Sequence, residues 1–160
     1  MNRLINSFRI SLWRGAFTSF ATLLALGFGV GGHSATPVSS ETVEMTASLS
    51  SKSEVPPIES NATGSVSIKF DKKTSLLSYE IKFANLSGPV TAAHFHGPAP
   101  VGKNAGVAVP IKGAMASPMI GGVTLNAAQS ADLLAGRWYV NLHTAAHPNG
   151  ETRGQVITQP

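Results

Sequence analysis

The chain contains no cysteine and few charged residues, and both shortages narrow what it can do. Without cysteine there is no disulfide bond, and thiolate metal sites such as blue-copper centres and cysteine-rich zinc sites are excluded. Charged residues make up only 12% of the chain, and no block of lysine and arginine supplies the electrostatic footprint that nucleic-acid binding needs. We therefore predict no nucleic-acid partner.

A long apolar run lies near the N-terminus. Arg3, Arg9 and Arg14 precede an apolar stretch over residues 15–30, and small residues follow over 31–35. This order is the layout of a secretory signal peptide, and the apolar part is shorter than the roughly 20 residues that a spanning helix needs. We predict a cleaved signal peptide over residues 1–35, a periplasmic or secreted protein, and no membrane contact beyond this leader.

Removal of that leader changes the charge and sets the domain count. The formal net charge of the whole chain is +4, and the three leader arginines carry most of it. The remaining residues, roughly 125 of them, are enough for one domain with an ordinary core and too few for two. We predict a short linker over residues 36–40 and a single domain over residues 41–158.

The part after the linker has the pattern of short β-strands. Polar and apolar residues alternate, with the two-residue period of a half-buried strand, over residues 42–49, 65–70 and 77–83. The polar turn at residues 71–74 joins the last two runs and predicts a hairpin. Further short strands are expected over residues 90–96, 107–111, 137–144 and 152–158. Pro110 places the strand that contains it at an edge or a bulge.

Residues 126–135 depart from this β pattern. Asn126 is a suitable N-cap, Leu133 and Leu134 are apolar, and Gly136 is placed to end a short helix. The sequence therefore predicts an all-β fold, an antiparallel Greek-key sandwich or flattened barrel of the immunoglobulin-like kind, with one short helix in a connection.

Four histidines outside the leader fall in two short segments. His94 and His96 share one face of the strand predicted over residues 90–96, with Cα atoms roughly 6 to 7 Å apart. That spacing lets both imidazole rings approach one ion with nitrogen–metal distances near 2 Å. His143 lies on the more polar face of a second strand, and His147 follows in the next turn. We predict a copper or zinc site formed by His94, His96 and His143, with His147 as a further candidate ligand.

The same residues are compatible with other interpretations. A His-x-His pair also occurs as two surface or hydrogen-bonded histidines, and a metal site requires the two segments to meet in space. Glu151 and Arg153 share a face of the last strand, where we expect an exposed ion pair worth about 0 to 1 kcal/mol. The alternative role for Arg153 is contact with an anion or a carboxylate of a ligand or partner.

Hydrolytic catalysis finds little support in the sequence. There is no Gly-x-Ser-x-Gly elbow, no His-Glu-x-x-His motif and no glycine-rich phosphate loop. The only aspartates, Asp71 and Asp132, lie in a lysine-flanked turn and in the predicted helix, where neither is suited to orient a histidine. We predict no catalytic residue and no cofactor other than the metal ion.

Three motifs in the second half of the chain occur in an order typical of one known module. They are AHFHGPA at residues 93–99, GRWYVNLHT at 136–144 and PNGETRGQ at 148–155. Together they resemble the CHRD domain, a module named from chordin and also found singly in exported bacterial proteins. The resemblance covers residues 41–157 and implies an all-β domain outside the cytoplasm, without a defined biochemical activity. His94, His96 and His143 fall on motif histidines of that family, whereas His147 occupies a position that the family fills variously.

A more distant likeness implies a metal-dependent reaction. The His-x-His pair, a later histidine and the Gly-x-x-Arg-Gly stretch at residues 150–154 are similar to copper/zinc superoxide dismutases, in which histidines hold copper and an arginine guides the anion. This chain lacks that family's disulfide cysteines and its bridging zinc ligands. Three hypotheses follow: a non-enzymatic exported module that binds copper or zinc, a dismutase-like copper redox enzyme, and a structural or protein-interaction domain without metal. The sequence does not identify a protein partner.

Overall fold

The computed structural model describes residues 41–159. The predicted signal peptide over residues 1–35 and the linker over 36–40 lie outside the described residues. Within the described part, the one α-helix spans eight residues, and no helix is long and apolar enough to cross a membrane.

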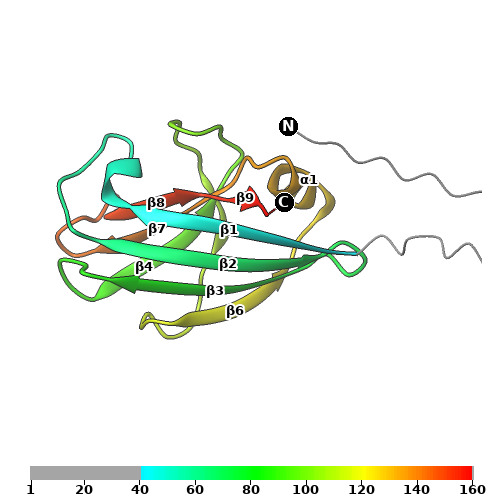
Figure 1. The fold of residues 1–160 in the computed structure, drawn as a ribbon, viewed down its shortest axis with the longest axis horizontal. Helices are drawn as coiled ribbons and strands as arrows, with labels where there is room; N and C mark the ends of the chain where they lie inside the picture. The colour runs from blue at the N-terminus through cyan, green and yellow to red at the C-terminus, as the bar shows by residue number, and fades with distance from the viewer. Residues whose placement is uncertain (1–40, 160) are drawn as a thin grey trace, which may run out of the picture. The chain divides into compact units, whose positions relative to one another are not determined.

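The described residues form nine β-strands, one α-helix and one turn of 3₁₀ helix (Figure 1). In chain order these are β1 (Thr42–Ser50), η1 (Ser51–Ser53), β2 (Thr63–Asp71), β3 (Leu76–Ala84), β4 (Val90–His96), β5 (Val107–Pro110), β6 (Met119–Thr124), α1 (Ala127–Leu134), β7 (Tyr139–Thr144), β8 (Thr152–Gln155) and β9 (Ile157–Thr158). All the strands belong to one antiparallel sheet in the order β5-β4-β7-β8-β1-β2-β3-β6, and β9 pairs with β1. The predicted all-β antiparallel fold is confirmed.

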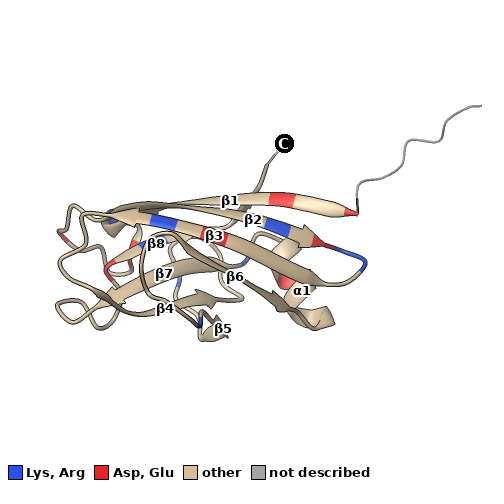
Figure 2. Cartoon of the chain, turned by 90° about the horizontal axis from the view of Figure 1, so that it is seen from below, with Lys and Arg blue, Asp and Glu red and all other residues tan. Residues whose placement is uncertain are grey.

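This sheet curls into a half-barrel rather than lying flat. Seen from below, β1, β2 and β3 form one wall, and β4, β5 and β7 form the other (Figure 2). β5 and β6 are its two edge strands, each pairing with one neighbour within the described chain. Pro110 ends β5 at that edge, where the missing backbone N–H breaks no ladder bond.

The predicted hairpin of β2 and β3 is present, and its turn is closed by an aspartate. Asp71 Oδ1 accepts hydrogen bonds from the backbone N–H groups of Lys73 and Thr74, at 2.8 and 3.0 Å. Ser75 then takes a positive φ of 58° before β3 begins. The resulting register pairs Phe70 with Leu77, so the apolar residues of both strands face the same side.

The core lies between the two walls and is rich in aromatic contacts. Phe95 of β4 has no exposed surface, and its ring centroid lies 5.3 Å from that of Tyr79 on the opposite wall. Trp138, which directly precedes β7, lies 5.9 Å from Phe95 on the other side. Burial of each such ring stabilises the fold by about 2 to 3 kcal/mol. The two walls are therefore joined through this aromatic cluster.

Two details of the predicted secondary structure were wrong. β6 was not predicted, because Gly121 and Gly122 have low strand propensity. In addition, Ile120 is apolar but 74% exposed, so the strand lacks the usual alternation of polar and apolar residues. The glycine at 121 is required, since a Cβ there would lie 2.3 Å from the hydroxyl oxygen of Tyr79. The last predicted strand divides into β8 and β9, with Val156 buried between them.

The short helix α1 is confirmed together with its signals. Asn126 Oδ1 accepts the backbone N–H of Gln129, and the Gln129 side chain accepts the backbone N–H of Asn126, which forms a capping box. Gly136 follows the helix with a positive φ of 67°, which suits glycine at this position.

Candidate metal centre

Two neighbouring strands bring the three predicted ligands together. His94 and His96 lie on β4 and His143 on β7, and the antiparallel register places His94 opposite Asn141. One ligand atom from each histidine lies within 4.8 Å of the others. The ring centroids of His94 and His143 are 5.0 Å apart, and those of His94 and His96 are 5.4 Å apart. The convergence that the metal hypothesis requires is therefore present.

A loop carbonyl selects the tautomer of His96. Its Nδ1 lies 3.0 Å from the carbonyl oxygen of Ala105, which only accepts, so Nδ1 carries the proton and donates it. In the neutral ring Nε2 then presents a bare lone pair. This Nε2 is buried and has no hydrogen-bond partner. A buried nitrogen that has a free lone pair and no hydrogen-bond partner is suited to bind a metal ion.

His143 is oriented in the same way from the other side of the cluster. Its Nδ1 lies 3.0 Å from the carbonyl oxygen of Pro148, so this nitrogen donates and Nε2 of the neutral ring accepts. That Nε2 lies 3.1 Å from Nδ1 of His94, which must then be the donor of the bond between the two rings. Backbone carbonyls thus hold two of the three rings with their lone pairs directed at a common region.

The environment favours neutral imidazoles. Burial lowers the pKa of His94, and the neighbouring His143 and His96 lower it further. Burial also lowers the pKa of His143; the hydrogen bond to Pro148 works in the opposite direction, but the net shift is downward. Because only a neutral imidazole can bind a metal ion, both rings are in the required form near neutral pH.

A stack of three planar side chains includes one histidine of the cluster. The ring of Tyr139 lies parallel to that of His96, with centroids 4.8 Å apart and an interplanar angle of 3°. The guanidinium of Arg153 lies 3.4 Å from the Tyr139 ring centroid. The Tyr139 hydroxyl also lies within hydrogen-bond distance of both the N–H and the carbonyl of Ala105. The stack therefore connects the metal candidates to the loop over residues 97–106.

Arg153 holds this loop directly. Its two terminal nitrogens donate to the Lys103 carbonyl at 2.6 Å and to Asn104 Oδ1 at 2.8 Å, and the residue is 2% exposed. The amide of Asn104 donates in turn to the carbonyl of Val55. These bonds place the 97–106 loop over the face of β4, β7 and β8 that carries the histidines. Contact of Arg153 with a ligand anion stays a prediction.

The expected exposed ion pair of Glu151 and Arg153 is wrong. Glu151 is fully buried, and its carboxylate accepts hydrogen bonds from Ser60, Ser87 and Thr144 at 2.7 to 2.8 Å. Burial works to raise the pKa of Glu151, but these hydrogen bonds outweigh it and the net shift is downward. Two-residue spacing does place side chains on one face, but the loops over residues 59–62 and 85–89 cover Glu151, and that long-range packing is not visible in the spacing.

His147 does not join the three other histidines. It lies in the turn between β7 and β8, where its backbone N–H and carbonyl both bond to Thr144. The side chain is half-buried and is not among the residues that converge. Its role as a ligand therefore stays a prediction without geometric support.

Two residues near the cluster were missed by the sequence reasoning. Asn141, 4% exposed, places its Oδ1 3.0 Å from Nε2 of His143. Glu54, 7% exposed, has a carboxylate oxygen without a hydrogen-bond partner. Burial raises the pKa of Glu54 to about 7 although the nearby Arg153 works to lower it. The alternation of β7 placed Asn141 on the histidine face, whereas nothing in the loop sequence signalled that Glu54 is buried.

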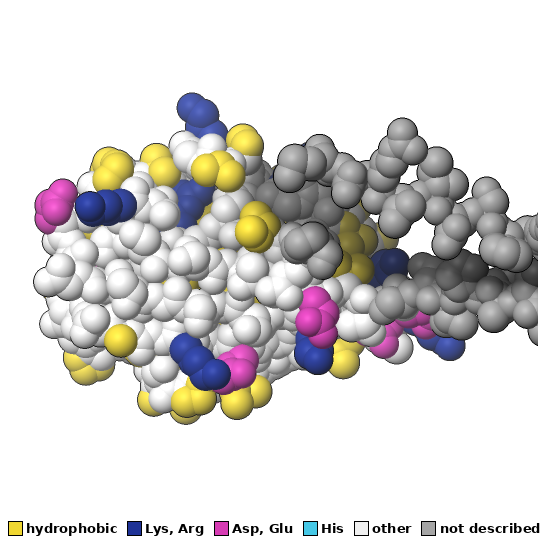
Figure 3. All heavy atoms as spheres, viewed as in Figure 1, with side chains coloured by type: hydrophobic (Ala, Val, Ile, Leu, Met, Phe, Trp, Pro, Cys, Tyr) yellow, Lys and Arg dark blue, Asp and Glu magenta, His cyan; other side chains and the backbone are white. Residues whose placement is uncertain are grey.

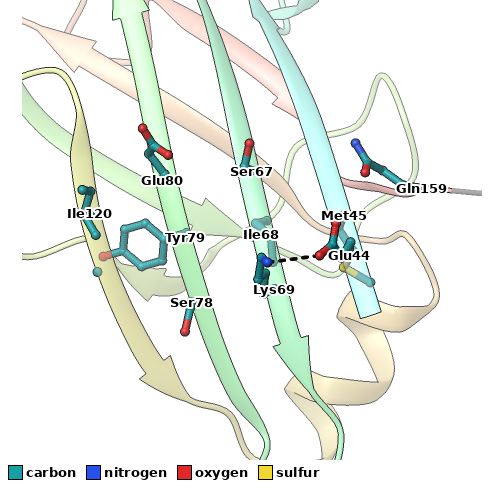
Figure 4. Close-up of a pocket in the computed structure, with 11 residues that line it drawn as sticks. Glu44, Met45, Ser67, Ile68, Lys69, Ser78, Tyr79, Glu80, Ile120 and Gln159 are labelled. Carbon is teal, nitrogen blue, oxygen red and sulfur yellow. Dashed lines mark ion pairs between the residues drawn. The ribbon is translucent and has the colours of Figure 1, made fainter. Parts of the chain in front are cut away.

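A hollow elsewhere on the described surface has fewer groups that could bind a metal or catalyse a reaction. It measures about 400 Å³ and lies along β1, β2, β3 and β6 (Figure 4). Lys69 and Glu44 at its rim neutralise one another in an ion pair of 3.2 Å. The face seen in Figure 3 carries scattered single apolar and charged side chains, and no histidine is visible on its described part. The histidine cluster is therefore the stronger candidate site.

Comparison with protein families matches the CHRD domain to residues 45–156, well over half of the chain. All three histidines of the cluster, the loop over 97–106 and Arg153 lie inside the matched range. No curated protein and no solved structure matches the chain. The likeness to copper/zinc superoxide dismutases therefore stays a prediction.

Proposed function

The chain belongs to the CHRD domain family, and from that premise we propose that it is an exported, non-enzymatic binding module that holds one copper or zinc ion through His94, His96 and His143. The observation that carries this proposal is the convergence of three imidazole nitrogens from two strands within 4.8 Å. Two of the rings are already oriented by backbone carbonyls, so binding requires little ordering of side chains.

The distances are compatible with a small divalent ion. Nitrogen–metal bonds of about 2.0 to 2.1 Å place two ligand nitrogens about 2.9 to 3.4 Å apart for bond angles of roughly 90° to 110°. The separation of 3.1 Å between His94 Nδ1 and His143 Nε2 already falls in this interval, and His94 binds through Nδ1 once its proton has moved to Nε2 of the same ring. All the ligand separations in the cluster lie within 4.8 Å, and any that exceeds about 3.4 Å has to shorten by rotation of the rings when the ion binds.

The ligand set excludes several other ions. Three neutral imidazoles without a carboxylate suit copper and zinc, whereas calcium and magnesium prefer oxygen ligands. Three protein nitrogens also leave at least one coordination position for a further ligand.

Metal uptake by the purified protein tests the proposal. Dialysis against Zn(II) or Cu(II) at neutral pH, followed by elemental analysis, should give one ion per chain in the wild type and less than a tenth of that in His94→Ala. His147→Ala is the matched control, because it removes a histidine outside the cluster, and it should bind one ion. A wild-type protein that takes up no stoichiometric metal would refute the metal proposal and leave a structural or partner-binding domain.

The export part of the proposal has its own test. The order of positive, apolar and small residues over 1–35 supports it, as does membership of a family whose domains are typically extracellular. Expression of the full chain in a host with a secretory pathway should yield a protein outside the cytoplasm whose mass lacks the leader. Recovery of the uncleaved chain in the cytoplasm would contradict export.

A further inference from the structure

The amide of Asn141 makes a contact with His143 that hydrogen bonding within the neutral cluster does not explain. Its carbonyl oxygen Oδ1 lies 3.0 Å from Nε2 of His143. Nδ1 of that ring faces the Pro148 carbonyl and holds the proton, so Nε2 presents a lone pair, and Oδ1 also presents only lone pairs. Two acceptors at this distance repel each other unless a cation, either a proton on Nε2 or a metal ion, lies between them.

The surroundings of the amide favour this orientation of Asn141. The nitrogen Nδ2, at the other end of the amide, lies beside Gly150. A Cβ built on Gly150 would lie 2.8 Å from this Nδ2 and 2.7 Å from Oε1 of Glu54, so both atoms face the same space. A carboxylate oxygen is an acceptor, so it favours an NH₂ group on its side of Asn141 over a carbonyl oxygen. The amide therefore directs Oδ1 away from Glu54 and toward the histidines.

From this geometry we propose that the Oδ1 atom of Asn141 is the fourth protein ligand of the metal centre. The inference rests on the proposed metal binding by the three histidines and extends it to an N₃O donor set. Asn141 lies on β7, two residues before His143 and on the same face, and it pairs across the ladder with His94. The two strands thus supply two ligands each.

The distances match the edges of one coordination shell. Oxygen–metal and nitrogen–metal bonds of about 2.0 to 2.2 Å give an oxygen–nitrogen separation near 3.0 Å when the bond angle at the metal is about 90° to 95°. The observed separations are 3.0 Å for Asn141 Oδ1 to His143 Nε2 and 3.1 Å for His143 Nε2 to His94 Nδ1. At each of these separations an ion bound to Nε2 of His143 can also lie about 2.1 Å from the neighbouring atom, and an ion beside Asn141 removes the repulsion between the two acceptors.

Burial gives the amide oxygen a definite consequence for affinity. Asn141 is 4% exposed, so water does not compete freely for Oδ1 before the ion arrives. Loss of this ligand should weaken binding by at least about tenfold, since removal of a group that only orients a metal ligand already costs roughly tenfold to a hundredfold.

Cu(II) is the probe for the experiment. Titration of the full chain with Cu(II) in the presence of a competing chelator gives affinity, and the broadening of the Cu(II) electron paramagnetic resonance signal by ¹⁷O-enriched water reports water molecules bound to the ion. In Asn141→Ala we expect affinity to fall at least tenfold and one more water to bind than in the wild type. Asn141→Asp keeps an oxygen at the same place and should restore affinity without the extra water.

The controls separate a failure of this inference from a failure of metal binding. Asn61→Ala, at an exposed asparagine in a loop outside the cluster, should bind Cu(II) like the wild type, and thermal unfolding checks that every variant is folded. If the wild type binds Cu(II) but Asn141→Ala has the same affinity and the same bound water, the assignment of Asn141 is overturned and the histidine site stands. If the wild type binds no Cu(II), the metal proposal and this assignment fail together.

Discussion

The buried carboxyl of Glu54 should make the protein less stable at alkaline than at acid pH, and Glu54→Gln should remove that loss. Burial raises the pKa of Glu54 from 4.5 to about 7 in the folded protein. Between these two values the folded state binds a proton that the unfolded state has released, so stability falls as pH rises. At about 1.4 kcal/mol for each pKa unit, the full loss above pH 7 is about 3 kcal/mol.

Glutamine has nearly the same shape as the protonated glutamic acid and does not titrate. We therefore expect Glu54→Gln to match the wild type at pH 4 and to exceed its unfolding free energy by about 2 to 3 kcal/mol at pH 8. The difference between the two proteins cancels the contributions of Glu151 and the histidines, which both contain.

Urea unfolding followed by circular dichroism, with a chelator present to remove metal ions, measures this difference at each pH. A constant difference between pH 4 and pH 8 would show that folding does not raise the pKa of Glu54. A variant less stable at pH 8 would show that attraction between the Glu54 carboxylate and Arg153 outweighs desolvation.

Three further variants and one control examine the buried polar groups and the close approach of strands. Glu151→Gln should lower the free energy of unfolding by about 1 to 3 kcal/mol at pH 7. Because the pKa of Glu151 is lowered in the folded protein, this difference should shrink as the pH falls below about 4.5. Urea unfolding at several pH values measures it. Arg153→Met should release the 97–106 loop and speed tryptic cleavage after Lys103 by about tenfold or more, seen by mass spectrometry, and an unchanged rate would remove Arg153 as the anchor. Gly154→Ala should lower stability by about 2 to 4 kcal/mol, since its Cβ would lie 2.3 Å from the Ser48 carbonyl oxygen, whereas Gly106→Ala, with open space around it, should change stability by less than about 0.5 kcal/mol.

Local sequence patterns were sufficient for much of the fold. The alternation of β2 and β3 around a polar turn depends only on neighbouring residues, and the same holds for the caps of α1. β6 was not predicted from the sequence, because Gly121 is there to make room for the ring of Tyr79, which is far away in the sequence, and glycine has a low strand propensity. The order of the strands, which places β8 beside β1, depends on long-range pairing that no local pattern encodes.

The candidate site shows the same division between local and long-range information. Alternation placed His94 and His96 on one face and His143 with Asn141 on another, and the pairing of β4 with β7 makes those two faces one. The carbonyls of Ala105 and Pro148 that orient the rings are backbone groups, which a sequence does not distinguish from any other backbone group. The sequence did not predict that Glu54 and Arg153 are buried, because the loops that cover them come from other parts of the chain.

The junction of the two walls has a thermodynamic consequence. Between β1 and β8 the ladder has one residue pair, Ser50 with Arg153, and β9 adds two pairs with β1, so few backbone hydrogen bonds join the wall of β1, β2 and β3 to the wall that carries the histidines. Apolar contacts across the core, such as that of Phe95 with Tyr79, also hold the two walls together. Attraction of this apolar kind weakens on cooling and carries a large heat-capacity change. The histidine face should therefore be held most loosely in the cold, and calorimetry of this domain should show a strongly curved stability profile.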